Sequence, residues 1–473
     1  MPPESVPRLR LLEKLGYGLG DTASNFFFQT FNLFLLYYYT DIFGLSAAAV
    51  GTMFLFTRVL DAITDPLMGA VADRTRTRFG KFRPYLLWGA IPYGACGYLM
   101  FANPDLSPTG KLVYAYVTYS AMMLAYTAIN IPYGALMGVM SPRTEDRTAL
   151  STYRFVCAFG GALLISSLVS PLKNALGGGD EANGFRMTMA LFAFASIALF
   201  LFCFATTRER VAPQDDGPTN LRHDLGLLFR NPAWLAMVFA ALFTLTQVAL
   251  RGGVTVYYLK YYARVHDRPV FWIFDHVSLF MTGGALAMIL GVALTPLVNK
   301  RWDKRKLMIV LSTLNALAMA SFFLLRPDQL VAVHVINILG TLVVGPTPAL
   351  VWAMYADTAD YGEWKFRRRM TGLIFSAAQF AQKMGLAVGV ALAGWVLELT
   401  GFVANVAQGE SSLLAIRLLF SVGPAALALL NVVAIYFYPL NDRTVKGIER
   451  DLAERRAAAA GAPPPPIAEA ATP

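Results

Sequence analysis

Charged residues are scarce in this sequence. Asp, Glu, Lys and Arg make up only 15% of its 473 residues, whereas 56% are hydrophobic and the mean hydropathy is +0.50. A water-soluble chain of this length needs more charge to cover its surface. The shortage excludes a soluble enzyme or binding domain and indicates a chain whose surface faces lipid.

Cysteine and histidine are rarer still, with three and four residues. Cys96, Cys157 and Cys203 all lie in apolar segments and lack the spacing of a disulfide framework or a metal site. The sequence also has no Ser/His/Asp set and no glycine-rich phosphate loop. We therefore expect neither an enzyme activity nor a cofactor.

Positive charge is in excess, with a formal net charge of +10, but it is confined to short clusters between hydrophobic runs. This placement predicts the orientation of membrane helices and argues against a nucleic-acid partner. The clusters fall in alternate loops and near both termini, which predicts a multi-pass protein of the cell membrane with both termini in the cytoplasm. They lie at residues 8–14, 74–83, 143–147, 208–230, 300–306, 365–369 and 443–450.

Long apolar runs recur along the whole chain, and one run of about 20 apolar residues suffices to span a bilayer. Hydropathy predicts an all-α polytopic membrane protein with twelve spans in two halves of six. The first six spans are expected at residues 17–40, 46–72, 84–102, 111–140, 150–172 and 185–206. The second six are expected at residues 233–262, 277–299, 306–325, 329–356, 371–398 and 413–438.

The longest polar stretch inside the chain, RERVAPQDDGPTNLRHDLGLLFRNP, separates these halves. We expect an N-terminal bundle at 1–206, a cytoplasmic linker at 207–232, a C-terminal bundle at 233–440 and a disordered cytoplasmic tail at 441–473. The basic loop DRTRTRFGKFRP before the third span has a weak counterpart, NKRWDKRKL, in the second half. Such internal duplication is typical of transporters with a central substrate path.

The second predicted span contains Arg58, Asp61 and Asp65 within the apolar stretch FTRVLDAITDPLMGA. Their spacing places them on one stripe of a helix, with Thr64 beside it. Charged groups at bilayer depth are costly, so they face a wet cavity or a partner. Two carboxylates and a hydroxyl can hold a small cation or a proton. The alternative is a structural salt bridge between Arg58 and one aspartate, which leaves the second aspartate unpaired.

Polar side chains occur in other predicted spans as well. Asp21 and Asn25 lie one turn apart in the first span, where Asp21 either contributes to a site or pairs near the helix start. In the fourth span Thr127 precedes Asn130, which either faces a substrate or forms an interhelical hydrogen bond. Arg154 in the fifth span either faces a cavity or extends to the cytoplasmic edge.

The seventh and eleventh spans each carry a pair of polar residues one turn apart. Gln247 and Arg251 form the first pair. Gln379 and Lys383 form the second, with Gln382 on the same side of the helix. A lone lysine in the middle of a span is best explained by function, so Lys383 is a candidate functional residue, and Gln379 on the same side is a candidate for substrate binding. The distribution over six spans fits two halves that close around a polar centre.

Five stretches of the sequence follow a known family pattern: KLGYGLGDTASNFF, YYYTDIFGLSAAAVGTMFLFTRVLDAITDPLMG, DRTRTRFGKFRPYLL, YTAINIPYGAL and YADTADYGEWKFRRR. They resemble the glycoside–pentoside–hexuronide:cation symporters, a family that includes the melibiose carrier and lies within the major facilitator superfamily. The resemblance extends over residues 10–440. It implies two pseudo-symmetric six-helix bundles, alternating access, and sugar uptake driven by Na⁺, Li⁺ or H⁺.

The resemblance also implies a coupling site in the N-terminal half. Asp61 and Asp65 match the acidic pair that binds the coupling cation, and they are metal ligands if that cation is Na⁺. Thr64 and Thr127 match positions that complete the site, although the family has asparagine at the first of them. No other cofactor is implied.

A substrate site follows from the same resemblance. Arg154 matches an arginine that contacts sugar hydroxyls, and Lys383 matches a lysine near both sites. Asn25 and Asn130 occupy positions where the melibiose carrier grips galactosyl hydroxyls with carboxylates, and Gly134 replaces its stacking tryptophan. These departures argue against melibiose as the substrate. Amides in place of carboxylates favour a glycoside or hexuronide, with a neutral pentoside or disaccharide as the alternative.

The sequence therefore predicts a monomeric sugar:cation symporter that uses Na⁺ or H⁺ and has a sugar or glycoside and membrane lipid as its partners. Asp21 is a candidate to restore a carboxylate to the sugar site. A lysolipid or amphiphile carrier of the same fold, an uncoupled sugar uniporter, and a membrane enzyme or channel are the alternatives. Gating or structural roles are assigned to Arg58, Asp73, Arg78, Asp357 and Asp360.

Overall fold

The computed structural model describes residues 8–211, 226–265, 269–299, 302–367 and 371–459. These residues are almost entirely helical, because a backbone surrounded by lipid has to satisfy its hydrogen bonds within its own segment. Extended pairing in this part of the chain is limited to two isolated bridges, Thr77–Gly80 and Phe271–Phe274. The predicted all-α membrane fold is confirmed.

The N-terminal half begins with a helix that extends beyond its α-helical part through two π-helical turns. Hydroxyl caps set the starts of the next long helices: Ser46 accepts a hydrogen bond from the Ala49 N–H, and Ser107 accepts one from the Gly110 N–H. The elements are α1 Leu11–Thr30, η2 Phe31–Leu35, η3 Tyr38–Ile42, α2 Ala47–Arg74, α3 Arg83–Leu99, α4 Pro108–Met140, α5 Thr144–Gly177 and α6 Glu181–Thr206.

The C-terminal half is built in the same manner, and its first helix also ends in a π-helical turn. Asn231 caps that helix through the Trp234 N–H, and Asp303 caps α10 through the Lys306 N–H. The elements are α8 Pro232–Tyr257, η4 Tyr258–Tyr262, α9 His276–Asn299, α10 Lys304–Ser321, η5 Phe322–Leu324, α11 Leu330–Val344, α12 Thr347–Phe366, α13 Thr371–Leu399, α14 Glu410–Phe420, α15 Val422–Tyr436 and α16 Asp442–Ala459.

Two predicted spans are interrupted in the structure. The span predicted at 329–356 consists of α11 and α12, which meet at Gly345 and Pro346, where proline has no N–H to continue the ladder. The span predicted at 413–438 consists of α14 and α15, which are separated by Ser421. Such interruptions are tolerated at bilayer depth where neighbouring helices surround them.

Ten helical segments of the described chain are long and apolar enough to cross a membrane. Each interrupted pair, α11 with α12 and α14 with α15, counts as one of these segments. Two of the twelve predicted spans are not among these ten segments. One corresponds to α3, which has only 17 residues, and the other corresponds to α1, which is continued by π-helical turns. The number twelve therefore stays a prediction.

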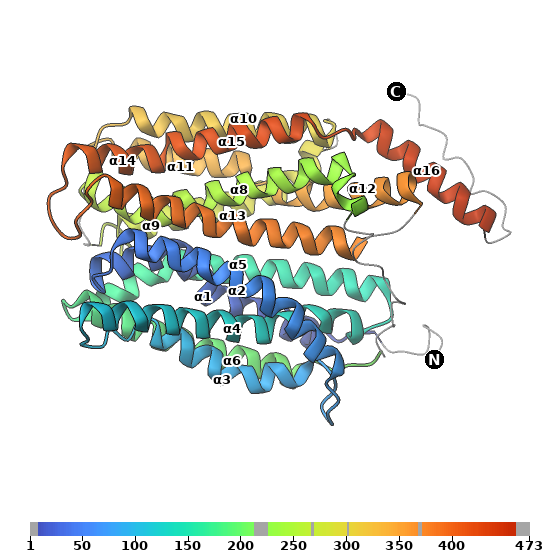
Figure 1. The fold of residues 1–473 in the computed structure, drawn as a ribbon, viewed down its shortest axis with the longest axis horizontal. Coiled ribbons are helices and arrows are strands. Elements are labelled where there is room, and N and C mark those ends of the chain that lie inside the picture. The colour runs from blue at the N-terminus through green and yellow to red at the C-terminus, as the bar shows by residue number, and fades with distance from the viewer. Residues whose placement is uncertain (1–7, 212–225, 266–268, 300–301, 368–370, 460–473) are drawn as a thin grey trace.

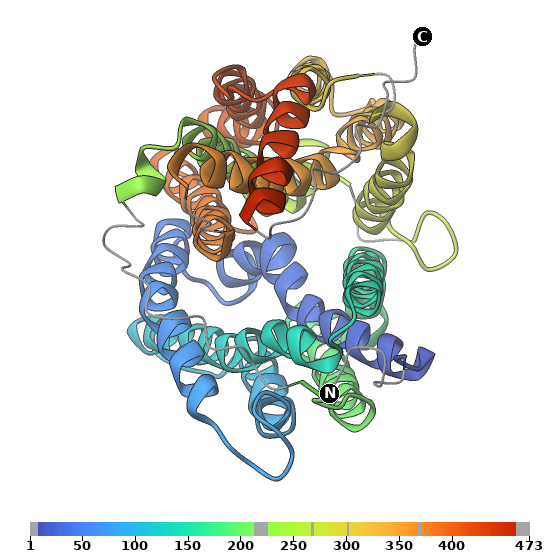
Figure 2. The same cartoon turned by 90° about the vertical axis from the view of Figure 1, so that its right-hand side faces the viewer.

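The helices run side by side in two groups. Figure 1 shows α1–α6 on one side of the molecule and α8–α15 on the other, and Figure 2 shows the same two groups viewed along the helices. Extensive contacts join α1 with α5 and α10 with α15 within the groups, while α2 with α13 and α5 with α9 pack across them. We refer to the groups as the N-terminal and C-terminal halves.

The two ends of the molecule differ in how closely the halves approach. One end carries α16 and the other carries the start of α14, so we name them the α16 end and the α14 end (Figure 1). Near the α14 end the start of α2 packs against α13 through small residues: a Cβ added to Gly51 would lie 3.0 Å from the Ala391 carbonyl oxygen. Gly394 likewise abuts Ala47. Small residues let two helix backbones touch, which closes this end.

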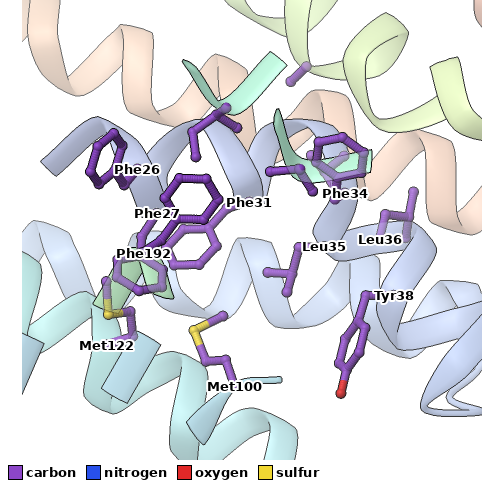
Figure 3. Packing of buried hydrophobic residues seen from close by; sticks show 14 of the residues in the cluster. Phe26, Phe27, Phe31, Phe34, Leu35, Leu36, Tyr38, Met100, Met122 and Phe192 are labelled. Atoms are coloured by element: carbon purple, nitrogen blue, oxygen red, sulfur yellow. The ribbon is translucent and has the colours of Figure 1, made fainter. Parts of the chain in front are cut away.

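Aromatic packing fixes the first helix inside its half. Phe26 and Phe27 of α1 project towards Phe192 and neighbouring side chains (Figure 3). The Phe26 and Phe192 ring centroids are 5.1 Å apart, and the Phe27 ring meets Tyr93 edge-on at 5.6 Å. Edge-on and tilted arrangements are the favoured geometries of aromatic pairs. Because this face of α1 is buried, the face with Asp21 and Asn25 turns elsewhere, towards α5.

The predicted disordered tail begins with an ordered helix, so that part of the prediction is wrong. Helix α16 has three apolar side chains on one face, Val445, Ile448 and Leu452, and all three are buried. Trp364 at the end of α12 donates a 2.9 Å hydrogen bond to Asp451 of α16. The apolar stripe supplies the packing surface that a disordered segment lacks. Residues 460–473, like residues 212–225 of the predicted linker, lie outside the described residues.

Candidate functional site

Asp61 is paired within its own helix. Its carboxylate lies 2.8 Å from the Arg58 guanidinium one turn earlier on α2, and only 7% of the Asp61 side chain and 11% of the Arg58 side chain are exposed. Arg58 also donates to the Met123 sulfur of α4 at 3.2 Å. The structural salt bridge that the sequence left open is thus present for Asp61.

Asp65, one turn further on, has partners from other helices. The Thr127 hydroxyl of α4 donates to it at 2.8 Å, and the Lys383 ammonium of α13 forms an ion pair with it. The predicted coupling residues Asp65 and Thr127 are therefore brought together with Lys383 from the other half. About a quarter of each charged side chain is exposed, 24% for Asp65 and 26% for Lys383.

The prediction that one arginine leaves an aspartate unpaired is wrong for this structure. Arg58 holds Asp61, and Lys383 holds Asp65, so each carboxylate has its own cation in this structure. The resemblance placed Lys383 near both sites, but helix spacing could not identify it as the partner of Asp65, because it belongs to a helix of the opposite half. The two aspartates differ in their ion-pair partners. Asp61 pairs with an arginine of its own helix, whereas Asp65 pairs with a lysine of the opposite half and about a quarter of its side chain is exposed.

Oxygen ligands for a small cation are available beside Asp65. The Thr127 hydroxyl is in contact with it, and the buried Thr64 hydroxyl has no hydrogen-bond partner among the described residues. An oxygen that lacks a partner can serve as a ligand, and hard cations prefer carboxylate and hydroxyl oxygens. A cluster of three or more acidic, histidine or cysteine side chains is not found in the described chain. The donor set fits one monovalent cation or one proton.

Asp21 and Arg154 form the centre of the predicted substrate site. Arg154 of α5 donates through Nε to the Asp21 carboxylate of α1, and its guanidinium lies 5.2 Å above the Tyr133 ring. The helices approach closely at Gly18, where an added Cβ would lie 2.8 Å from the Tyr153 carbonyl oxygen. Arg154 is therefore turned inward and does not extend to the membrane edge. Because Asp21 is engaged by Arg154, a free carboxylate for sugar is not available there in this state.

The two asparagines predicted to bind substrate, Asn25 and Asn130, differ in their hydrogen bonds. Asn25 donates to the Asp21 carbonyl oxygen at 2.9 Å, and its own side-chain oxygen has no hydrogen bond within the described part of the chain. Asn130 accepts a 2.9 Å hydrogen bond from Ser24 and donates to the Tyr126 carbonyl oxygen at 3.1 Å. Asn130 thus makes the interhelical bond that the sequence analysis left open, whereas Asn25 keeps an acceptor for a ligand.

Gln379 is exposed on α13, one turn before Lys383, and it forms no hydrogen bond within the described residues. The structure therefore places it beside Lys383 but brings it into contact with none of the other predicted residues. Its neighbour Gln382 lines a cavity.

Apart from Arg58, the residues assigned gating or structural roles are divided between the halves near the α16 end. Asp73 pairs with Lys81 at 2.9 Å, and Arg78 lies 4.7 Å above the Phe79 ring, both contacts within the N-terminal half. Asp357 pairs with Lys304 inside the C-terminal half. These described contacts stay within one half each. Asp360 is half-buried in α12, without a polar contact in the described chain.

Polar contacts that were not predicted from the sequence hold the halves together at the α14 end. Lys260 of η4 lies 3.2 Å from the Asp41 carboxylate of η3, and Tyr261 donates to the same carboxylate. The Asn405 side chain donates to the Asp41 carbonyl oxygen at 2.5 Å. Asp41 and Lys260 both lie in the π-helical turns that end the first helices of the two halves, and a charged residue at the end of each apolar span was the available signal.

A second missed contact joins α5 to α9 at the same end. Ser170 donates to Asp275, and Asn174 donates to the same carboxylate at 3.3 Å. Thr282 donates to Ser167 at 3.0 Å. Among the described residues, polar contacts between the halves thus occupy the α14 end and reach inward as far as Asp65 and Lys383.

A cavity of about 540 Å³ lies mainly in the C-terminal half. It is lined by Arg251 and several amide and hydroxyl side chains of α8–α15, and it also touches Gln29 of α1 and Phe159 of α5. Gln29 is one turn beyond Asn25, and Phe159 is little more than one turn beyond Arg154. The cavity therefore reaches α1 and α5 within about one to one and a half turns of Asn25 and Arg154, which do not line it themselves.

Comparisons with known proteins agree with this geometry. The family model described as MFS/sugar transport protein matches residues 16–442, and the chain belongs to that family within the major facilitator superfamily. YagG of Escherichia coli (strain K12), which carries "glycoside/cation symporter" in its name, is 38% identical over 453 residues, with 96% of this chain and 97% of YagG covered. The resemblance found in the sequence is confirmed.

Two further similarities are informative. The isoprimeverose transporter of Lactiplantibacillus pentosus is 34% identical, with 94% of this chain and 92% of that transporter covered. Among solved structures, a bacterial homolog of the human lysosomal transporter Spinster, in an inward-facing and unoccupied conformation, superposes with a TM-score of 0.64. It is 15% identical, and the match covers 90% of this chain and 95% of that one. At this identity the likeness supports the fold alone.

Proposed function

We propose that this chain is a sugar:cation symporter that couples the movement of a glycoside to that of Na⁺ or H⁺ by alternating access. Its relatives include a protein named as a glycoside/cation symporter and a transporter named for isoprimeverose. The halves are held together at the α14 end. In this proposal the α16 end faces the cytoplasm and the structure is an inward-facing state.

The observation that carries the coupling proposal is the ion pair between Asp65 and Lys383. It joins the two halves at the inner limit of their polar contacts, where the halves must separate and reclose during transport. A carboxylate left without a partner at this depth is costly. A cation that binds Asp65 removes that cost when Lys383 moves away, so ion binding and movement of the halves become linked.

Substrate binding is assigned to the neighbouring face of α1 and α5. Asn25 offers an amide oxygen, and Arg154 offers guanidinium N–H groups beyond the one that Asp21 accepts. Amides and guanidinium groups are suitable donors and acceptors for sugar hydroxyls. Linkage then requires that bound sugar tightens cation binding by the same factor by which the cation tightens sugar binding.

Counterflow and gradient-driven uptake in proteoliposomes test this function. The full chain is reconstituted and assayed with a panel of glycosides, uronides and a lysolipid, with an inward Na⁺ gradient, an inward H⁺ gradient and neither. We expect concentrative uptake of a glycoside only under one of the two gradients. Uptake of the lysolipid alone, or sugar uptake that never exceeds equilibrium under either gradient, would refute the proposal.

A further inference from the structure

Arg251 is a charged side chain in the C-terminal half for which the coupling and sugar sites have no use. It projects from α8 among three phenylalanines, with its guanidinium centre 4.8 Å from the Phe322 ring centroid, 4.9 Å from Phe420 and 6.0 Å from Phe280. Its Nη2 donates to the Asn337 oxygen at 3.2 Å, and its buried Nε has no partner among the described residues. Within the described part of the chain, this guanidinium makes one hydrogen bond, so most of its five N–H donors are available.

The other cationic side chains near the middle of the predicted membrane spans each have a carboxylate partner. Arg58 is paired with Asp61, Lys383 with Asp65, and Arg154 with Asp21. No carboxylate of the described chain forms an ion pair with Arg251, so one positive charge is left over. Aromatic faces attract a guanidinium but do not neutralise it, and a desolvated cation without an anion is unfavourable.

The surroundings of Arg251 are polar enough to receive a ligand. The residue lines the cavity of about 540 Å³ together with Gln247, Asn315, Asn337 and Thr341. Cavities of this size hold small organic ligands, and a few convergent polar groups on an otherwise apolar wall fix their orientation. The cavity also touches α1 and α5, next to the face assigned to the sugar.

We propose that Arg251 and Asn337 form a subsite for an anionic substituent, a carboxylate or sulfonate, on the transported glycoside. This rests on the proposed sugar transport and adds the class of sugar. The unused N–H groups of Arg251 match the two oxygens of a carboxylate, which a guanidinium binds in a bidentate manner. The sugar ring then extends towards Asn25 and Arg154, and the bound anion neutralises the charge that the side chains leave uncompensated.

Matched pairs of ligands test the subsite. The full-length protein, purified in detergent, is titrated with methyl glucuronide, methyl galacturonide and methyl 6-deoxy-6-sulfoglucoside, and with the neutral methyl glucoside and galactoside. Dissociation constants are taken from ligand-induced shifts in Tm. We expect at least one acidic glycoside to bind about tenfold or more tightly than its neutral partner, a difference of about 1.4 kcal/mol.

Variants separate binding from structure. Arg251→Gln should remove most of the preference for the acidic glycoside, and Arg251→Lys should restore part of it. Arg417→Gln is the matched control, because Arg417 also packs on aromatic rings of this half, those of Tyr262 and Phe323, but does not line the cavity. It should leave the ratio between acidic and neutral ligands unchanged.

Each other outcome overturns the subsite. The subsite is refuted if no acidic glycoside binds more tightly than its neutral partner. It is also refuted if Arg251→Gln leaves the ratio of acidic to neutral affinities unchanged, or if Arg417→Gln lowers that ratio as much as Arg251→Gln does. Potassium sulfate that stabilises the protein as much as an acidic glycoside would show a site for inorganic anions. The proposed function is tested separately by gradient-driven uptake. If sugar uptake does not depend on an ion gradient but the protein still binds acidic glycosides more tightly than neutral ones, symport is refuted and the subsite is not.

Discussion

Lys383 on α13 forms an ion pair with Asp65 on α2, two residues that are 318 positions apart in the chain. The pair joins the halves, and it is the innermost of the polar contacts between them in the described structure. In the proposed mechanism this tethered ammonium occupies the place of the coupling cation. This competition, together with the closed α14 end, underlies the first three predictions.

Asp65→Cys should abolish uphill uptake while some exchange remains. The thiol cannot hold the cation that links ion binding to movement of the halves, but the sugar contacts of α1 and α5 are untouched. We expect gradient-driven accumulation to fall by about tenfold or more, within the usual range of coupling between two sites. Counterflow without a gradient measures the remaining exchange. Normal concentrative uptake by this variant would remove Asp65 from coupling.

Lys383→Ala should tighten cation binding. With the ammonium gone, Asp65 loses its fixed partner and an ion no longer competes with a tethered charge, so we expect the ion concentration for half-maximal binding to fall roughly tenfold. The measurement is a titration of the purified protein with NaCl at constant ionic strength, and with pH in a parallel series. Weaker binding, or none of either ion, would contradict the competition between Lys383 and the cation.

Gly394→Val should slow transport by preventing closure of the α14 end. The added side chain meets the Ala47 backbone, and overpacking of this kind costs about 1–3 kcal/mol in the state that contains the contact. We expect the turnover number in counterflow to fall by about tenfold. Gly138→Val on α4 is the control, because no atom lies within 4 Å of a Cβ added there. Equal turnover of the two variants would argue against closure by small residues.

Gly18→Ala should destabilise the N-terminal half. The added methyl group would lie 2.8 Å from both the Tyr153 carbonyl oxygen and the Cys157 sulfur, so α1 and α5 must move apart. We expect a loss of about 1–3 kcal/mol in stability and a Tm several degrees lower in detergent. Gly160→Ala on α5 has open space around its Cβ and should leave the Tm within a degree or so of the wild type. A similar fall in both variants would contradict the close approach at Gly18.

Much of the site was accessible from the sequence because helix periodicity is local. The spacing of Arg58, Asp61 and Asp65 predicts one stripe, and Arg58 does pair with an aspartate on it. The resemblance placed Thr127 with Asp65, and the structure shows them in contact. What the spacing could not supply was the partner of Asp65, because Lys383 belongs to another helix.

The fold divides in the same way. Apolar runs predicted helices near most of the observed ones, since hydropathy is a property of neighbouring residues. The interruptions at Gly345–Pro346 and Ser421, and the order of α16, depend on which helices pack beside these segments. A span that is uniformly apolar carries no mark of where a neighbour will allow it to break.

The sequence by itself determined that the chain is a helical membrane protein of the sugar transport family, and it determined which few polar residues the lipid phase has to accommodate. A charged side chain within an apolar run can be recognised from the sequence even when the position of its partner is unknown. Only the tertiary structure decided how these charges pair, which end of the molecule is closed, and that Arg251 is left without an anion among the described residues. The reason is physical: ion pairs form between helix faces, and faces meet only when the bundle is assembled.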